Sequence, residues 1–497
     1  MTAVAALVAG ASITLALAPF DLKWLILLGP ALLYLIQRHQ TPRQAMLNGY
    51  VFGLGFWGAG ASWVYVSINT YGNASALLAA TLTSLFVMAL ALLFALQGWL
   101  FAQLARNAGQ RWLVFTAVWV GFEWLRSWLL TGFPWLYVGY AALDTPLANW
   151  APLTGVWGLS LLLVLLATGC ARALADRKWL PLLPGLILAI LSVAVPRHWT
   201  SPTESAPLKV VLVQPNIPQL LKWQPDQLTP ILQRQILLSL PHEDADVLIW
   251  PETAIPATFS RAAPILGPFL DQLDREGIAL ISGFPYAETA PDTPYGQRFH
   301  NSLGIFSAGS DLYHKQRLVP FGEYVPLEQQ LRGLIDFFNL PMSSFSLPQD
   351  NTDALELDGI RIGAAICYEI AYPQLVSHMA QGSELLLTVS NDTWFGRSIA
   401  PAQHLQIARM RALENGRWLM RATNNGHTAL IDPRGNVHAE APLDTATTLA
   451  GEVQPMQGST PVQRFGLWPL LAGLAGLLLL AYWRPGQRHT LKHHRST

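Results

Sequence analysis

Long apolar runs fill the first two fifths of the chain and constrain its fold more than any other feature. A helix of about 20 apolar residues is long enough to cross a bilayer. The first run, 1–20, lacks the basic flank of a cleaved signal peptide, so we interpret it as a retained span. The sequence predicts eight spans, or seven if the short run 24–36 does not cross. The further runs lie at roughly 24–36, 45–68, 75–104, 112–131, 150–171, 179–196 and 466–483.

The composition favours a membrane protein with a soluble part attached. Only 12% of the residues are charged, against about 25% in typical soluble domains. The formal net charge is zero, so nothing indicates nucleic acid as a partner. Of the two cysteines, Cys170 lies inside an apolar run and Cys367 in a polar-rich region, so we expect no disulfide. The sequence contains no P-loop and no metal-binding Cys/His cluster.

Basic residues gather in every second loop between the apolar runs. The stretches SINTYGNAS, after the third run, and LDTPLAN, at 143–149, contain none. Arginine and lysine in short loops are biased towards the cytoplasm. The alternation predicts cytoplasmic termini and an outer, periplasmic location for the block between the seventh and eighth spans. The basic residues that follow the second, fourth and sixth runs are Arg38, Arg43, Arg106, Arg111, Arg172, Arg177 and Lys178.

The chain changes character after the polar linker 197–207. From 208 to 455 it alternates short β-rich runs with helical patterns, which predicts a layered α/β domain. Residues 456–497 would then hold the eighth span and a basic cytoplasmic tail. The predicted strands are KVVLVQPN, DVLIWPE, IALISGFPY, HNSLGIFS, IRIGAAICYE, ELLLTVSND, WLMRATNNG and HTALIDP, and the predicted helices include 227–240, 263–276 and 401–415.

Three polar side chains follow predicted strands in this domain. Glu252 comes directly after DVLIW in WPETAIP, and Cys367 ends the strand IRIGAAI in AAICYEIAYP. Lys315, in YHKQRLVPFGEYVP, follows HNSLGIFS. Taken alone, each has an ordinary explanation: a solvated turn glutamate, a surface lysine and a buried, inert cysteine.

Together the three residues supply a base, a cation and a thiol nucleophile, which are the groups that acyl transfer needs. A thiol with a pKa of about 8.5 needs a base or a positive neighbour to become a thiolate. Glu252 can take the proton, and Lys315 can stabilise the thiolate and a later oxyanion, helped by the backbone N–H of Tyr368. No histidine stands near a matching strand end, which argues against a Cys–His pair. Sequence alone does not show that the three side chains meet.

Several ordered motifs resemble those of the carbon–nitrogen hydrolase (nitrilase) superfamily: WPETAIP, HKQRLVPFGEYVP, AAICYEIAYP, SNDTWFG and RALENGRWLMRATNNGHTALIDPRG. Membrane spans before and after such a domain resemble the bacterial apolipoprotein N-acyltransferase family. The resemblance implies an αββα sandwich in which Glu252 is the general base, Lys315 stabilises the transition state and Cys367 is the nucleophile. It further implies supporting or substrate-binding roles for Glu323, Tyr368, Glu369, Trp223 and Trp394. Packing, ion pairing or interfacial anchoring remain open as their roles.

The resemblance also implies an activity. A phospholipid would donate an acyl chain to Cys367, and the N-terminal amine of a diacylglyceryl apolipoprotein would accept it, without metal or organic cofactor. Such an enzyme is expected as a monomer in a bacterial inner membrane. The apolar loop 334–345 and Trp394 would dip towards the lipid bilayer beside the catalytic pocket.

Two other functions remain open. A membrane-anchored amidase or nitrilase would use the same triad, with water as the second nucleophile. A transporter or receptor would only bind a ligand in its outer domain, but the spans carry few ionisable residues. The main pair is Glu123 and Arg126, whose spacing favours a structural i,i+3 contact.

Overall fold

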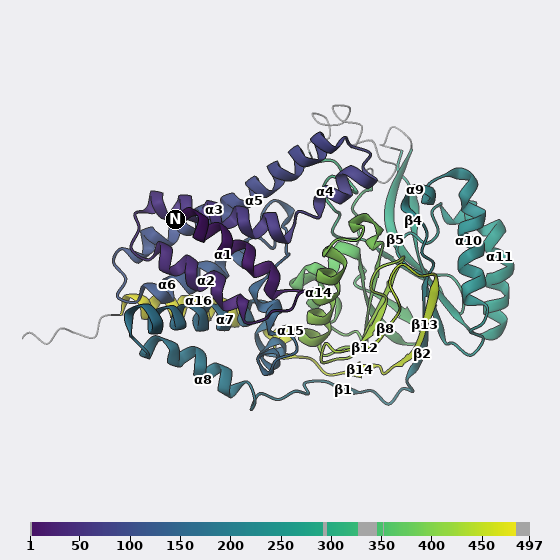
Figure 1. The fold of residues 1–497 in the computed structure, drawn as a ribbon. Helices are drawn as coiled ribbons and strands as arrows, with labels where there is room; N and C mark the ends of the chain where they lie inside the picture. The colour runs from purple at the N-terminus through teal and green to yellow at the C-terminus, as the bar shows by residue number, and fades with distance from the viewer. Residues whose placement is uncertain (1, 292–295, 327–344, 351, 484–497) are drawn as a thin grey trace, which may run out of the picture.

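The computed structural model describes residues 2–291, 296–326, 345–350 and 352–483. A helical region, formed by the N-terminal helices and by α16 (Trp468–Tyr482), packs against a β-rich domain. Figure 1 shows the two parts side by side. The predicted tail beyond 483 and most of the apolar loop 334–345 lie outside the described residues.

The helical region contains a helix within every predicted apolar run. Its helices are α1 (Thr2–Ala16), α2 (Leu25–Gln37), α3 (Pro42–Gly60), α4 (Val64–Val66), α5 (Ala76–Ala105), α6 (Arg111–Leu125), α7 (Ala151–Asp176), α8 (Leu183–Leu191) and α16 (Trp468–Tyr482). Local sequence sets several of the boundaries. Thr41 accepts a hydrogen bond from the backbone N–H of Gln44 at the start of α3, and Ser75 accepts one from Leu78 at the start of α5.

These helices differ in length. By length and composition, two described helical stretches can each cross a membrane: α5, and α7 together with the turn before it, 146–176. A third candidate is the pair α3 and 64–71, which is bent by 59°. Four further apolar helices, α1, α2, 180–191 and α16, are shorter. The number of spans therefore stays a prediction.

The β-rich domain is built on two six-stranded sheets. One has the order β13-β2-β3-β4-β5-β6 and the other β12-β11-β10-β9-β8-β7. In each sheet the three central strands are parallel and the flanking strands antiparallel. The strands are β2 (Leu208–Gln214), β3 (Val247–Ile249), β4 (Ala279–Thr289), β5 (Gln297–Ile305), β6 (Asp311–His314), β7 (Ala354–Leu357), β8 (Ile360–Ile366), β9 (Leu385–Ser390), β10 (Leu419–Thr423), β11 (Ala429–Ile431), β12 (Val437–Glu440) and β13 (Thr447–Val453).

Side chains on alternate faces of β2 pack into two different cores. Val210 and Leu212 belong to the cluster that includes residues of the second sheet, whereas Val211 and Val213 pack with α10 (Leu228–Ser239) and α11 (Phe259–Glu276). On the far side of the second sheet lie α13 (Pro373–Met379) and α14 (Ala400–Asn415), and α14 faces the helical region (Figure 1). The domain is thus a four-layered αββα sandwich.

All eight predicted strands and the three predicted helices of this domain are confirmed. The sequence prediction missed β6, β7, β12 and β13. A pairing between the two segments that flank the domain was also not predicted. The strand β1 (Ser201–Pro202) of the linker joins β14 (Met456–Gln457), which is followed by the short helix α15 (Pro461–Phe465). A further short helix, α9 (Gln219–Lys222), follows β2.

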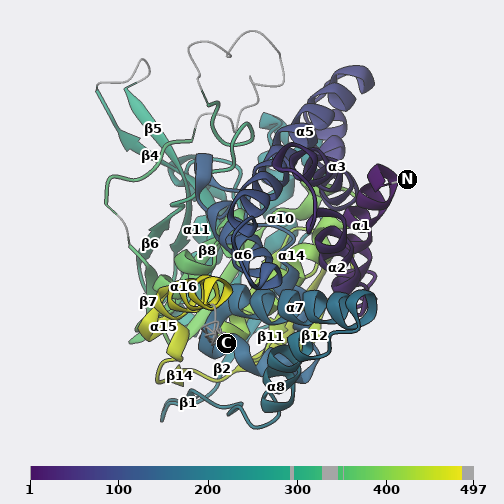
Figure 2. The same ribbon diagram turned by 90° about the vertical axis from the view of Figure 1, so that its left-hand side faces the viewer.

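Polar residues of α14 hold the domain against the helical region. Gln403 accepts a hydrogen bond from Trp135 Nε1 at 2.7 Å and donates one to the carbonyl of Gly60. Glu414 accepts a hydrogen bond of 2.6 Å from the backbone N–H of Val156, where α7 is kinked at Gly155. Figures 1 and 2 show that α5 and the β4–β5 ribbon extend at the same end of the molecule.

Candidate active site

Glu252 lies in the loop after β3 and is 4% exposed. Its Oε1 accepts a hydrogen bond from Asn301 Nδ2 at 2.9 Å and lies 3.3 Å from Lys315 Nζ. Its Oε2 accepts a hydrogen bond of 3.0 Å from the backbone N–H of Asn391, which follows β9 of the other sheet. The strand β4 passes so close that a Cβ on Gly283 would lie 2.9 Å from the Glu252 Cα. The carboxylate is therefore fixed between the two sheets.

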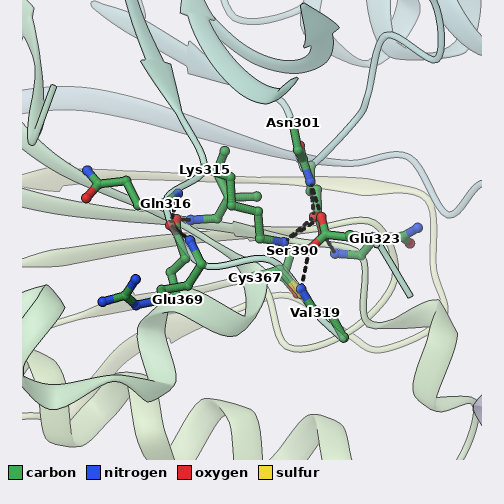
Figure 3. Close-up of polar contacts among 12 residues, drawn as sticks. Asn301, Lys315, Gln316, Val319, Glu323, Cys367, Glu369 and Ser390 are labelled. Carbon is green, nitrogen blue, oxygen red and sulfur yellow. Dashed lines mark hydrogen bonds and ion pairs between the residues drawn. The ribbon is translucent and has the colours of Figure 1, made fainter. Parts of the chain in front are cut away.

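Lys315 follows β6, and its ammonium lies between two carboxylates. Its Nζ donates to Glu323 Oε1 at 2.9 Å, and Asn301 Nδ2 bridges the same oxygen and Glu252 Oε1. Burial alone would lower the pKa of Lys315, but the carboxylates of Glu323 and Glu252 outweigh it and raise that pKa above its usual range. Figure 3 shows Asn301, Lys315 and Glu323 converging next to Cys367. Lys315 thus remains a cation at any physiological pH.

Cys367 stands at a sharp turn directly after β8. Its φ of +55° lies in the left-handed region, which is strained for a residue with a Cβ. Cys367 is partly exposed, while the last five residues of β8 before it, 362–366, are buried. Burial in the site raises the pKa of the Cys367 thiol, and the nearby Glu252 carboxylate raises it further. The sulfur therefore rests as a thiol, and a base would be needed to convert it to the nucleophilic thiolate.

Glu369 ties this turn to the segment after Lys315. One of its oxygens accepts hydrogen bonds from the backbone N–H groups of Gln316 (2.5 Å) and Arg317 (3.0 Å). The other accepts from the Ile366 N–H at 2.7 Å and the Tyr313 hydroxyl at 2.8 Å. Burial raises the pKa of Glu369 to about 7. Since Gln316 follows Lys315 and Ile366 precedes Cys367, this carboxyl group sets the position of the ammonium relative to the thiol.

The helical region supplies a support for Tyr368, the residue after the thiol. The Tyr368 hydroxyl donates to the carbonyl of Gly132 at 3.1 Å, and its ring stacks on Phe133 and Trp135 at 6.5 and 6.4 Å between centroids. The nearby Tyr372 hydroxyl donates to Thr131 in the same loop. The turn at Cys367 therefore rests on the helical region.

Trp223 and Trp394 belong to a small apolar cluster near the site. Trp223 follows α9, and its ring packs against the buried residues Leu318 and Phe345, as does the ring of Trp394. Trp394 also meets the helical region, because its carbonyl accepts a hydrogen bond from the Ser67 hydroxyl. Phe345 is the one residue of the predicted lipid-facing loop 334–345 within the described part of the chain.

Comparisons with known proteins agree with both parts of this architecture. Residues 9–169 match the model described as the apolipoprotein N-acyltransferase N-terminal domain, and residues 209–461 match the carbon-nitrogen hydrolase model. A protein named apolipoprotein N-acyltransferase from Pseudomonas syringae pv. tomato is 47% identical over 474 residues, covering 94% of this chain and 93% of that protein. This chain belongs to the apolipoprotein N-acyltransferase family. A relative of the same name from Vibrio parahaemolyticus is 38% identical over 499 residues, covering 97% of each chain.

Solved structures with some similarity to this chain include a protein named as a member of the nitrilase superfamily and one named as a carbon-nitrogen hydrolase. A branch 10 member from Saccharomyces cerevisiae matches with a TM-score of 0.39 and 19% identity, covering 51% of this chain and 93% of that one. A carbon-nitrogen hydrolase from Helicobacter pylori matches with a TM-score of 0.36 and 15% identity, covering 54% and 94%.

In this apolipoprotein N-acyltransferase family member, the structure brings together Glu252, Lys315 and Glu323 through direct contacts and places Cys367 beside them. The sequence analysis missed Lys222, whose buried Nζ donates to the backbone carbonyl of Glu252 at 2.9 Å. Burial lowers the pKa of Lys222 to about 8. Its place directly before the conspicuous Trp223 was the only signal for it in the sequence.

A histidine lies close to Cys367, although it does not follow a strand. His404 reaches Cys367 from α14 instead of from a strand end, and its Nε2 lies 3.1 Å from the Cys367 carbonyl oxygen. It contacts the backbone and not the sulfur, so a Cys–His pair of the protease type is still not formed. The predicted contact of Glu123 and Arg126 is confirmed as a buried pair at 3.6 Å.

Proposed function

We propose that this protein transfers an acyl chain from a phospholipid to the N-terminal amine of the diacylglyceryl cysteine of an apolipoprotein, through a thioester on Cys367. The observation that carries the proposal is a buried ammonium, Lys315, held between the carboxylates of Glu252 and Glu323 beside a thiol. The printed name of its relatives, apolipoprotein N-acyltransferase, supports this substrate class.

In the first half-reaction the Cys367 sulfur attacks the ester carbonyl of the phospholipid. Glu252 takes the thiol proton, which the raised pKa of the thiol makes necessary. Lys315 and the backbone N–H of Tyr368 stabilise the oxyanion of the tetrahedral intermediate. When the intermediate collapses, Glu252 returns the proton to the leaving alkoxide. A lysophospholipid departs, and the acyl chain remains as a thioester.

In the second half-reaction the neutral α-amine of the diacylglyceryl cysteine attacks the thioester carbonyl. Glu252 accepts a proton from the attacking nitrogen, and Lys315 again faces the oxyanion. Collapse forms the amide and releases the Cys367 sulfur, which regains its proton from Glu252. The two substrates thus react in turn at one site, in a ping-pong order.

The helical region fits substrates that are dissolved in a membrane. We propose that it crosses the inner membrane of a bacterium eight times, with cytoplasmic termini and the sandwich domain in the periplasm. The apolar cluster around Trp223 and Trp394 would contact the acyl chain and keep water from the thioester. Glu323 holds Lys315, while Tyr368 and Glu369 hold the nucleophile turn.

The test is a search for the acyl-enzyme. Purified protein is incubated with a phospholipid carrying an isotope-labelled acyl chain, and the intact protein is then weighed by mass spectrometry. We expect one labelled chain on Cys367, released by hydroxylamine and transferred to the amine of a diacylglyceryl peptide. Cys367→Ser and Glu252→Gln should lose the adduct. Cys170→Ser, which removes the other of the chain's two cysteines, should keep the adduct.

The rival function is an amidase or nitrilase with water as the second nucleophile. Absence of an adduct in the wild type, together with hydrolysis of small soluble amides, would replace the transferase proposal by this one.

A further inference from the structure

A buried polar network lies directly behind Cys367, and the reaction steps above do not use it. His404 Nε2 lies 3.1 Å from the Cys367 carbonyl oxygen, and His404 Nδ1 lies 3.1 Å from Asp392 Oδ1. Arg421 Nη2 lies 2.7 Å from Asp392 Oδ2 and 3.1 Å from His404 Nδ1. The side chains of His404, Asp392 and Arg421 are fully buried.

The surroundings of the imidazole ring determine where its proton lies. Burial and the neighbouring Arg421 cation lower the pKa of His404, so the ring is neutral at physiological pH. The Cys367 carbonyl can only accept, so the single proton of the neutral ring lies on Nε2 and points to that carbonyl. His404 Nδ1 then faces both the Arg421 guanidinium, which donates to it, and the Asp392 carboxylate, which can only accept. Asp392 orients Arg421, and its Oδ1 accepts a hydrogen bond from the Ser390 hydroxyl at 2.6 Å.

The hydrogen bond from His404 acts on a strained part of the backbone. Cys367 has a φ of +55°, a conformation that a residue with a Cβ adopts only when its surroundings hold it. Cys367 is the first residue of the 3-10 helix Cys367–Ala371, and His404 holds the direction of its carbonyl. Glu369 holds the other side of the turn through the N–H of Ile366.

The three-residue segment 390–392, which contains Asp392, also contacts Glu252, the proposed base. The backbone N–H of Asn391 donates to Glu252 Oε2 at 3.0 Å, while Asp392 orients Arg421 and so the ring of His404. Ser390 contributes as well: its hydroxyl donates to Asp392 and is hydrogen-bonded to the Cys367 side chain. One segment therefore couples the position of the carboxylate to the position of the thiol.

We propose that His404 is a positioning residue for the nucleophile: its Nε2–H, oriented by Arg421 and Asp392, holds the carbonyl of Cys367 and fixes the left-handed turn that presents the thiol to Glu252. This inference rests on the proposed function for its acyl-transfer readout. The contact itself is geometric and has a second readout that needs no acyl donor.

Three variants of one position separate positioning from folding. His404→Gln keeps an N–H donor close to the position of Nε2, because the glutamine amide nitrogen lies at about the same distance from Cα. His404→Asn places its amide near Nδ1, and His404→Leu removes the donor. His438→Gln is the matched control, because His438 is exposed on β12.

The first measurement is the rate of thioester formation at saturating labelled phospholipid, with the KM for the lipid. Misplacing a reacting group by about 1 Å costs about 100-fold in rate. We expect His404→Leu and His404→Asn to lose about 10- to 100-fold in kcat with an unchanged KM, and His404→Gln to keep most of the rate. Equal rates for the glutamine and asparagine variants would overturn the proposal, even if the leucine variant does not fold.

The second measurement is alkylation of Cys367 by iodoacetamide, followed by mass spectrometry between pH 7 and 10. We expect the same order of rates, with wild type and His404→Gln above His404→Asn at each pH. If the wild type forms no thioester but this order holds, the proposed function fails and the positioning role stands. If all variants alkylate equally, the positioning role fails regardless of the acyl chemistry.

Discussion

Replacing Lys222 by methionine should stabilise the protein while reducing its activity. The Lys222 side chain is 3% exposed, and its ammonium donates one hydrogen bond of 2.9 Å, to the backbone carbonyl of Glu252. Burial lowers its pKa from the ordinary 10.5 to about 8, against the raising effects of Glu252 and Cys367. At pH 7 the group is nevertheless charged, so the folded state carries a poorly solvated cation.

The size of the effect follows from that pKa. A tenfold change in an ionisation constant corresponds to about 1.4 kcal/mol. The gap between 10.5 and about 8 therefore costs the folded state about 3 kcal/mol at pH 7. Methionine has a similar length and no charge, but it leaves the Glu252 carbonyl without its donor, a loss of about 1 kcal/mol. We expect Lys222→Met to raise the free energy of unfolding by about 2 kcal/mol at pH 7.

The lowered pKa of Lys222 also determines how the stability of the protein changes with pH. Between pH 8 and 10.5 the unfolded chain binds more protons at Lys222 than the folded protein does, so wild-type stability rises with pH in this window. The advantage of Lys222→Met should therefore shrink above pH 8 and disappear near pH 10, where the remaining cost of the cation equals the about 1 kcal/mol lost with the hydrogen bond. Activity should fall at pH 7, because the variant lacks a cation that attracts the Glu252 carboxylate and the Cys367 thiolate.

Thermal unfolding of the purified proteins in detergent, measured at pH 7 and pH 10, tests these statements. For a domain of this size, about 2 kcal/mol corresponds to about 4–8 °C in Tm. Lys209→Met, at an exposed lysine of β2, is the control and should shift Tm little at either pH. A lower Tm for Lys222→Met at pH 7, or an equal gain at both pH values, would refute the reasoning.

Three further substitutions test the site. Glu369→Leu removes the acceptor of four hydrogen bonds, two of them fully buried, and should lower both Tm and the acylation rate, the rate by about 100-fold; an acylation rate near that of the wild type would contradict its positioning role. Gly426→Ala would place a Cβ 2.4 Å from Asp392 Oδ2 and should slow iodoacetamide alkylation of the nucleophile; an unchanged rate would show that the network behind it is dispensable. Tyr368→Phe loses the hydrogen bonds of the hydroxyl to Gly132 and Tyr372 and should cost about 1–2 kcal/mol of stability, measured by Tm, whereas a rate loss above about 10-fold would indicate a direct role of the hydroxyl.

Much of the sandwich domain could be predicted because its strands have a strong local signal. Runs such as VVLV in β2 are apolar on both faces, as expected of strands buried between layers. The missed strand β13, TTLAGEV, mixes polar and apolar residues without strict alternation and is only partly buried, and it pairs with β2 over seven residues. Such pairing is a tertiary contact and leaves little trace in local sequence.

The residues of the candidate site likewise fall into those that local sequence indicates and those that only tertiary packing brings into place. Glu252 and Cys367 end strands, and the carboxyl ends of parallel strands commonly form binding sites, so their positions could be predicted from strand ends. Asn301 lies within β5 and reaches both carboxylates, but nothing in its local sequence indicates this. His404 lies in the predicted helix 401–415, where the face that meets Cys367 is set only by how α14 packs.

The candidate active site is shared between the sandwich domain and the helical region. On one side of the nucleophile turn, His404 holds the Cys367 carbonyl; on the other, Tyr368 stacks on Trp135 and bonds to Gly132. The two sides are themselves in contact, since the Trp135 ring lies 5.6 Å from the His404 ring and Trp135 donates to Gln403 one residue before it. A movement of the helical region relative to α14 must therefore change the geometry at Cys367. A family member reduced to its sandwich domain would keep Glu252 and Lys315 in place but lose the contacts of Tyr368 that support the turn at Cys367.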